Sequence, residues 1–232
     1  MVYVALQAVL DDIARRQVDR TICLGDVATL GPEPAKVIAS LRDLGCPCIM
    51  GNHDAFLLDP DLIRSYSEVP VIVESVDWCQ EQITPADREF LGTFRPVIEL
   101  LPDPQTPILL FHGSPRSNME DLWVRTPAEE VDLMMEGHEA LVMAGGHTHL
   151  QMLRQHHGAL IINPGSVGLP FKEHISSGEP TILTHAEYAI IEADRGAVTV
   201  ELHRLPLERS ALYDAVAGSD LPLAKTLVQD YS

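Results

Sequence analysis

Apolar residues recur at helical spacing near the start of the chain. Four of them occupy positions i, i+3, i+4 and i+7, namely Leu6, Val9, Leu10 and Ile13. This spacing puts them on one stripe, so we expect an amphipathic helix from about residue 3 to residue 17. Prolines at positions 32 and 34 favour the start of a second helix, which Gly45 is expected to stop.

Short apolar runs that end at polar side chains are the second pattern. Runs at 21–24, 48–50, 107–111 and 141–144 are each followed closely by one or two potential metal ligands: Asp26, Asn52, His112, and the pair His147 and His149. Such runs are typical of buried parallel strands. Because ligand sites in open α/β sheets lie beyond the carboxyl ends of the strands, we expect these side chains to meet.

Further helices are expected in the middle and at the end of the chain. Residues 73–92 have a helical pattern that Thr84 and the proline after it divide in two. Residues 126–129 have the pattern of a capping box and predict a helix that Gly137 closes. The tail from residue 207 carries short helical patterns.

Two hairpins are expected in the second half. Residues 150–155 and 159–162 flank His156, His157 and a glycine, so we expect these two histidines to be exposed turn residues with no role. A second hairpin is expected within residues 188–204.

The charge balance narrows the possible partners. Acidic residues number 34 against 16 basic ones, for a formal charge of -18, which argues against general binding to nucleic acid or to anionic membranes. No apolar run approaches the roughly 18 residues of a membrane span, and the N-terminus lacks a secretion signal. The four cysteines show no disulfide spacing. We therefore expect a soluble, cytoplasmic protein.

The candidate ligands specify a class of ion. Carboxylate, amide and imidazole groups without thiolate suit Mn, Fe, Co, Ni or Zn, and composition does not choose among them. A metal centre in an acidic protein attracts anionic substrates through the charge of the ion, and phosphate esters are the natural candidates.

The chain resembles the calcineurin-like metallophosphoesterase family, and most closely its small bacterial phosphatase and phosphodiesterase branch. The resemblance covers about residues 3–205 and rests on five motifs in the family's order: Gly25-Asp26, Gly51-Asn52-His53-Asp54, His112-Gly113, Gly146-His147-Thr148-His149 and Asn163-Pro164-Gly165-Ser166. It implies a four-layer α/β/β/α sandwich with a two-metal centre at one edge.

The resemblance also implies roles for the motif residues. Asp26 would bridge two ions, and His149 would bind the second of them. The first ion would be completed by Asn52, His112 and His147. His53 would act as the general acid or stabilise charge on the phosphoryl group, with Asp54 or another carboxylate orienting it.

One family element has no counterpart in the sequence. Family members begin with a strand that ends in Asp-x-His, whereas this sequence starts where the first helix should begin, so the first strand is expected to be missing. The second ion then keeps only Asp26 and His149, and two ligands are too few for a firm site. Two ions are expected if the N-terminal ligands exist, and otherwise one.

Three readings of this departure stay open. In the first reading, the protein is a two-metal enzyme and about ten of its N-terminal residues are absent from the given sequence. We favour this reading because every other motif residue is present. Alternatively, the protein folds with one ion and altered activity. In the third reading it is a degenerate member that serves as a non-catalytic binding or scaffold module.

Other residues have smaller expected parts. Arg116 is a candidate for contacting a substrate phosphate, and Asn163 for supporting the double-histidine loop from beneath. Residues 114–124 and 169–186 are expected to wall the pocket. We expect a phosphoesterase domain over residues 1–206 and a helical tail over 207–232, packed on the domain or on a partner.

The expected partners follow from this chemistry. We expect a small phosphorylated substrate or a phosphoprotein, with no general nucleic-acid binding and no membrane binding. A homo-oligomer is possible, because the absence of the first strand would leave a sheet edge exposed.

Overall fold

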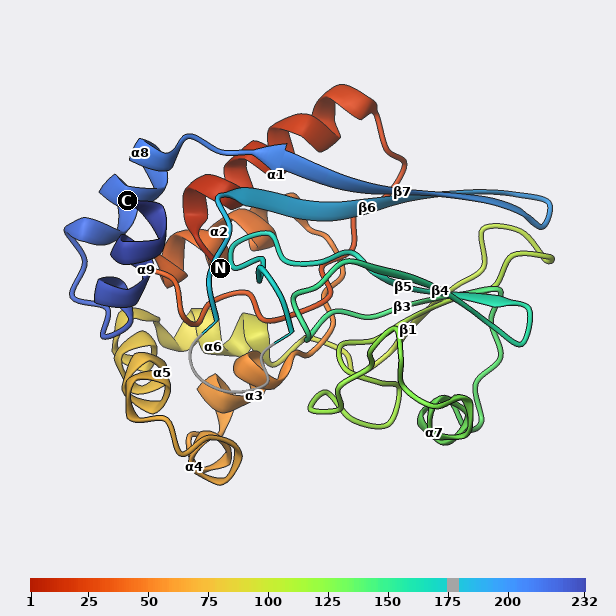
Figure 1. The fold of residues 1–232 in the computed structure, drawn as a ribbon, viewed down its shortest axis with the longest axis horizontal. Coiled ribbons are helices and arrows are strands. Elements are labelled where there is room, and N and C mark those ends of the chain that lie inside the picture. The colour runs from red at the N-terminus through yellow and green to blue at the C-terminus, as the bar shows by residue number, and fades with distance from the viewer. Residues whose placement is uncertain (175–179) are drawn as a thin grey trace.

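The core of the protein is a mixed sheet that ends at one edge in polar loops. In this computed structural model, which describes residues 1–174 and 180–232, the sheet has the strand order β1-β2-β3-β5-β4. The strands are β1 (Ile98–Leu100), β2 (Ile108–Leu110), β3 (Val142–Ala144), β4 (Met152–His156) and β5 (Ala159–Asn163). A separate hairpin joins β6 (His185–Asp194) and β7 (Ala197–Pro206). Figure 1 shows the hairpin lying over the larger sheet.

The alternation of side chains along the strands produces two buried faces. Strands β2 and β3 run parallel with Leu109 opposite Met143. These two side chains pack with α7 (Ala128–Met134) on one face. Their chain neighbours, such as Leu110 and Ala144, pack on the other face, against side chains of β6 and β7. Successive strand residues point to opposite faces, which is why continuous apolar runs are needed here.

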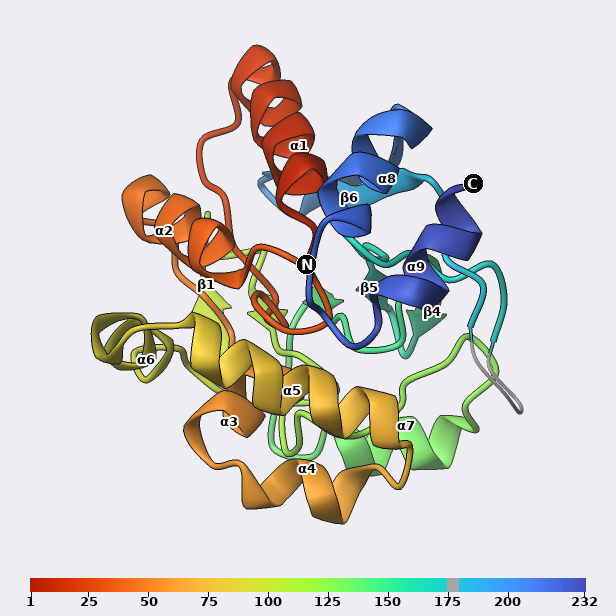
Figure 2. The same cartoon turned by 90° about the vertical axis from the view of Figure 1, so that its left-hand side faces the viewer.

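The resulting layers are the predicted ones. Beyond the β6–β7 hairpin lies α1 (Tyr3–Arg16), together with α8 (Arg209–Ala217) and α9 (Ala224–Tyr231). The order is therefore helices, hairpin, sheet and α7, which confirms the four-layer α/β/β/α expectation. Figure 2 shows α8 beside α1, and α9 beside α8. The tail thus packs on the body of the protein within the same chain.

The remaining helices surround the segments that carry Asp26 and Asn52. They are α2 (Pro34–Leu44), α3 (Asn52–Leu58), α4 (Asp61–Tyr66), α5 (Pro70–Gln82) and α6 (Pro85–Leu91). The predicted strands at 21–24 and 48–50 form only isolated bridges, Cys23 with Cys48 and Ile49 with Arg95. The two segments pair through only two backbone hydrogen bonds, in which Cys23 N–H donates to the carbonyl oxygen of Pro47 and Ile49 N–H donates to that of Cys23. This pairing is too short for either segment to be assigned as a strand.

A large cleft runs between the sheet and the hairpin. It measures about 1150 Å³ and is lined on one side by apolar residues such as Ile22, Leu110 and Ile162, and on the other by Ala189 and Ile191. At one end it reaches the predicted metal ligands.

Local expectations were met to different degrees. Thr84 caps α6 as predicted, accepting a hydrogen bond from the backbone of Asp87. The capping box at 126–129 was wrong: α7 begins at Ala128, and the Thr126 hydroxyl instead accepts from the backbone N–H of Trp123. The predicted pocket-wall loop 169–186 includes residues 175–179, which lie outside the described residues. No helix in the described part of the chain has the length and hydrophobicity to cross a membrane.

Candidate metal centre

Three of the predicted ligands have an unusual backbone. Asp26, His147 and His149 have φ angles of 57°, 66° and 58°, in the left-handed region that side chains other than glycine seldom adopt. Such strain persists only where the surrounding structure holds it, and it clusters at functional sites. In each case it turns the chain sharply just after an apolar run, so that the side chain faces the end of the cleft.

Close backbone approach brings the first two loops together. A Cβ atom built on Gly25 would lie 2.6 Å from the backbone nitrogen of Gly51, and one built on Gly51 would lie 2.1 Å from Oδ1 of Asp26. Neither position leaves space for a side chain. The two glycines therefore allow Asp26 to sit beside Asn52, the first residue of α3.

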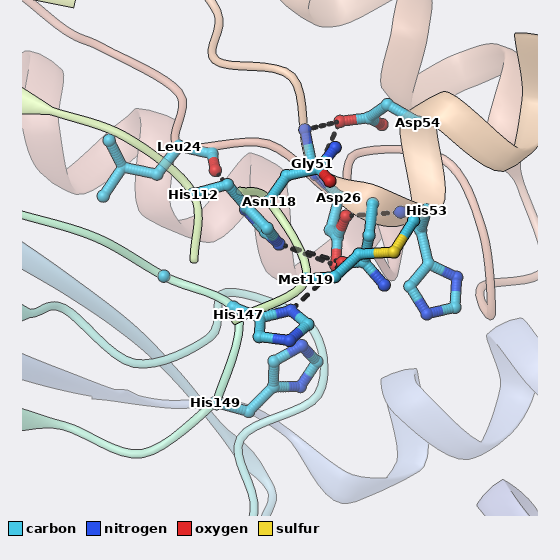
Figure 3. A network of polar contacts seen from close by, with 12 residues as sticks. Leu24, Asp26, Gly51, His53, Asp54, His112, Asn118, Met119, His147 and His149 are labelled. Carbon is cyan, nitrogen blue, oxygen red and sulfur yellow. Dashed lines mark hydrogen bonds and ion pairs between the residues drawn. The ribbon is translucent and has the colours of Figure 1, made fainter. Parts of the chain in front are cut away.

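Four side chains converge at this point (Figure 3). Oδ2 of Asp26 lies 3.2 Å from Nε2 of His112. Oδ1 of Asn52 lies 3.2 Å from that same nitrogen and 3.1 Å from Nδ1 of His147. Ligand atoms of Asp26, His112 and His147 all lie within 4.8 Å of one another. The structure thus brings together the four residues expected to hold the first ion.

The hydrogen bonds around His112 show that this cluster fits a cation. Its Nδ1 lies 2.6 Å from the carbonyl oxygen of Leu24, which only accepts, so Nδ1 carries the proton. In the neutral imidazole Nε2 then presents a lone pair, and it faces oxygens of Asp26 and Asn52. Acceptors that meet in a buried space repel one another unless a positive charge lies among them.

The pKa shifts of His112 and Asp26 reflect their mutual attraction. Burial opposes the charged form of His112, but the Asp26 carboxylate more than offsets burial and raises the pKa of His112 above its usual value. Burial likewise opposes ionisation of Asp26, yet the imidazoles, above all His112, hold its pKa well below its usual range. The site therefore already stabilises one positive charge beside a carboxylate.

His149 is oriented differently from the other two histidines. Its Nδ1 donates to the carbonyl oxygen of Leu169 at 2.7 Å, which leaves Nε2 as an acceptor. Burial lowers the pKa of His149 to about 4, so the ring is neutral and available as a ligand at neutral pH. Figure 3 places it beyond His147, on the same side of the cluster.

Asp54 holds the backbone of the site together. Its carboxylate accepts hydrogen bonds from the backbone N–H groups of Asp26, Val27 and Gly51 at 2.7, 2.9 and 3.0 Å. Burial and the nearby Asp26 charge raise the pKa of Asp54 to about 6. The expected role of orienting His53 is not what these contacts provide, because both carboxylate oxygens are directed at loop amides.

His53 lies next to the ligands with a free ring nitrogen. Its backbone N–H donates to Oδ1 of Asp26, its ring rests edge-on against Phe56, and its buried Nδ1 has no hydrogen-bond partner. Burial lowers the pKa of His53 to about 4. The His53 ring is therefore neutral at neutral pH, and its Nδ1 is available to a bound molecule.

The other two predicted site residues have contrasting positions. Asn163 donates from Nδ2 to the carbonyl oxygen of Gly146 at 2.6 Å and to the Thr148 hydroxyl at 3.0 Å, so it supports the double-histidine loop. Arg116 instead forms an ion pair with Glu120 and donates to the carbonyl oxygen of Leu133. Its guanidinium is therefore occupied away from the ligands.

One functional contact was not predicted from the sequence. Oδ1 of Asp121 lies 3.3 Å from Nε2 of His147, so a proton on Nε2 points to the carboxylate and Nδ1 keeps its lone pair for an ion. Carboxylates in this position orient metal-binding histidines and raise their basicity. Asp121 lies in an aperiodic acidic loop, where no sequence pattern marks it.

The sequence profile of the calcineurin-like phosphoesterase superfamily domain matches residues 3–184. This chain belongs to that superfamily. Membership places the protein, at a coarse level, among the metal-dependent phosphoester hydrolases. The convergent candidate ligands agree with a centre for a divalent metal ion.

Individual relatives cover nearly the whole chain. An uncharacterised protein of Methanocaldococcus jannaschii is 25% identical over 224 residues, which make up 94% of this phosphoesterase and 88% of the relative. The crystal structure of a metallophosphoesterase from Sphaerobacter thermophilus is also 25% identical, with a TM-score of 0.73 over 98% of this chain and 93% of the other. A hypothetical protein from Pyrococcus horikoshii, 18% identical with a TM-score of 0.75 over 99% and 97% of the two chains, supports the fold alone.

Proposed function

We propose that this phosphoesterase hydrolyses a phosphate monoester or diester at the Asp26 centre. The observation that carries the proposal is the convergence of three acceptor atoms in a nearly buried site. Oδ2 of Asp26 and Oδ1 of Asn52 each lie 3.2 Å from Nε2 of His112. Lone pairs that meet in a buried site cost free energy unless a positive charge lies among them, and a bound divalent ion would supply that charge.

The residues divide into two ligand sets. Asp26, Asn52, His112 and His147 would hold the first ion, and Asp26 with His149 would contribute to a second. Their oxygen and imidazole donors suit Mn, Fe, Co, Ni or Zn. When bound, such ions activate water as a nucleophile and stabilise negative charge on the phosphoryl group.

His53 is proposed to act on the leaving group. Its unpartnered Nδ1 is the polar atom at the cleft that the protein itself leaves unused. A phosphate anion beside the ring would favour its protonated form, so the imidazole would hold a proton for the departing oxygen only when substrate is present. A hydrogen bond to the phosphoryl group is the other role that this position allows.

The burial of the ligands limits the substrate. The side chains of His112, His147 and Asp26 are only 3%, 6% and 13% exposed, so the phosphoryl group must enter the end of the cleft. A small phosphate ester or a phosphorylated side chain on a protruding protein segment would fit. The charge of -18 makes the local positive charge of an ion the main attraction for such an anion.

The test compares Asp26→Asn with the wild type. Both proteins are loaded with Mn²⁺, and hydrolysis of p-nitrophenyl phosphate and bis-p-nitrophenyl phosphate is measured together with bound metal. We expect Asp26→Asn to lose metal and at least about 10³-fold in turnover, while Asp43→Asn on the exposed surface of α2 changes neither. Equal turnover in Asp26→Asn would refute the proposal. Bound metal without turnover in the wild type would favour the non-catalytic binding module.

His53 is tested by varying the leaving group. If His53 delivers a proton, His53→Ala should lower turnover of an alkyl phosphate by about 10² to 10⁴-fold. It should affect a p-nitrophenyl ester much less, because that leaving group needs no proton. An equal loss on both substrates would assign His53 to the phosphoryl group instead.

A further inference from the structure

A second group of metal-ligating side chains lies far from the catalytic centre. It joins Asp132 of α7 to His156 and His157 at the turn between β4 and β5. Nε2 of His156 lies 2.7 Å from Oδ1 of Asp132, and Nε2 of His157 lies 3.1 Å from that same oxygen. All three ligand atoms fall within 4.8 Å of one another.

The backbone of the turn brings the two histidines to the same side. Neighbouring residues of a strand normally point to opposite faces. Here the strand ladder ends at His156, paired with Ala159. His157 and Gly158 then have φ angles of 47° and 88°, as in the tight turns of two-residue hairpins. The left-handed conformation of His157 swings its imidazole back beside that of His156, with ring centroids 4.3 Å apart.

A neighbouring residue fixes the hairpin to the start of α7. Nη1 of Arg154 donates to the carbonyl oxygens of Trp123, Val124 and Thr126, the closest at 2.6 Å. Asp132 follows one helical turn after the start of α7. The distance between the helix and the turn is therefore set by contacts other than those of the histidines, and Figure 1 shows α7 beneath the hairpin.

The cluster is separate from the catalytic ligands. The double-histidine loop precedes β4, and His156 is the last residue of that strand. Four residue steps from Met152 to His156, at about 3.3 Å each, place His156 roughly 13 Å farther along the sheet. The described catalytic contacts include none of these three residues.

The geometry is close to that of a three-ligand site. Bonds of about 2.0 to 2.1 Å to a tetrahedral zinc ion imply distances of about 3.3 Å between ligand atoms. The observed 2.7 and 3.1 Å would need to lengthen by only a few tenths of an ångström. The side chain of His156 is 8% exposed, whereas His157 and Asp132 are 70% and 50% exposed, so an ion can enter from solvent and keep a water in the fourth position.

We propose that Asp132, His156 and His157 form a second binding site for a borderline divalent transition ion, with zinc as the best match. Two imidazoles and one carboxylate are ligands of this class. Glu129, one turn earlier on α7, adds negative charge on the same side of the helix. An ion bound here would link α7, which covers the outer face of the sheet, to the β4–β5 hairpin.

The test counts zinc and locates it. The full chain and three variants are freed of metal with a chelator, dialysed against the same free zinc concentration, and analysed for zinc per chain. We expect His157→Asn and Asp132→Asn each to bind one ion fewer than the wild type. Substitution of a residue that only supports a ligand typically lowers metal affinity by roughly 10- to 100-fold. Loss of a ligand itself should lower the zinc affinity by more than this. The matched control His138→Asn removes another partly exposed histidine and should bind as the wild type does.

A second measurement needs no variant and excludes the catalytic centre. Wild-type protein is treated with diethyl pyrocarbonate with and without zinc, and ethoxycarbonylation of each histidine is mapped by peptide mass spectrometry. The proposal expects zinc to protect His157 at least tenfold and to leave His138 unprotected. Equal labelling of His157 in both samples, or an unchanged zinc count in both variants, would show a hydrogen-bonded His–Asp cluster without metal and would overturn the proposal.

Discussion

The carboxylate of Asp54 accepts a hydrogen bond of 2.7 Å from the backbone N–H of Asp26, the residue at the centre of the candidate metal site. It also accepts from Val27 and Gly51. One buried side chain therefore fixes the two loops that deliver Asp26 and Asn52. Asp54 would therefore hold the proposed ligands in place without binding the ion itself.

Removal of Asp54 should damage stability as well as activity. Asp54→Ala leaves three backbone donors without their partner, and each buried donor so orphaned costs about 1 to 3 kcal/mol. We expect the free energy of unfolding to fall by at least about 2 kcal/mol in urea titrations of the metal-free protein. Asp54→Asn keeps an accepting oxygen and should lose less. If Asp54→Ala unfolds at the wild-type urea concentration, the anchoring role is wrong.

Gly51 should tolerate no side chain. A methyl group there would lie 2.1 Å from Oδ1 of Asp26 and 2.5 Å from its backbone nitrogen, so the ligand must move. We expect Gly51→Ala to lower metal affinity and kcat/KM at least tenfold, with an overpacking cost of about 1 to 3 kcal/mol in stability. Gly218→Ala is the control, because a Cβ there meets no described atom within 4 Å. Wild-type metal affinity in Gly51→Ala would contradict the close approach.

Asn163 should act through the double-histidine loop. Its amide group donates to Gly146 and Thr148, while its oxygen accepts from the backbone N–H of Gly165. Asn163→Asp keeps the acceptor and removes both donors. We therefore expect Asn163→Asp and Asn163→Ala to weaken metal binding alike, by about 10- to 100-fold in calorimetric titration. A wild-type dissociation constant for Asn163→Asp would show that the donated bonds are not needed.

The convergence of the candidate metal ligands was predictable because each follows a short apolar run. The rule that parallel strands deliver their carboxyl ends to one edge then places Asp26, Asn52, His112 and His147 together without knowledge of distances. The left-handed backbone of Asp26, His147 and His149 could not be predicted from the sequence, because only the neighbouring glycines hint at it.

Contacts that depend on packing between distant segments were not predictable. Asp121 reaches His147, and Asp132 reaches His156, only because the loop before α7 and the helix itself fold back onto the sheet. Neither aspartate belongs to a motif. Arg116 shows the converse: its motif-adjacent position suggested a phosphate ligand, but Glu120, four residues later, pairs with it locally.

The cap of α6 should give the protein part of its resistance to acid. Burial opposes ionisation of Asp87, but hydrogen bonds from the backbone and hydroxyl of Thr84 and from Arg42 outweigh burial and lower its pKa. A group whose pKa is lower in the folded state stabilises the protein above its unfolded pKa, which is about 3.9 for aspartate. That contribution is lost as the pH falls through the folded pKa.

Asp87→Asn tests this linkage. We expect the variant to be less stable than the wild type by about 1 kcal/mol at pH 7, measured by urea unfolding of metal-free protein. The difference should shrink as the pH is lowered below about 4, because the wild type then also loses the charged cap. Asp43→Asn, at an exposed position on α2, should show no such convergence. A stability difference for Asp87→Asn that stays constant from pH 7 to pH 3 would mean that the carboxylate charge is not what stabilises the helix end.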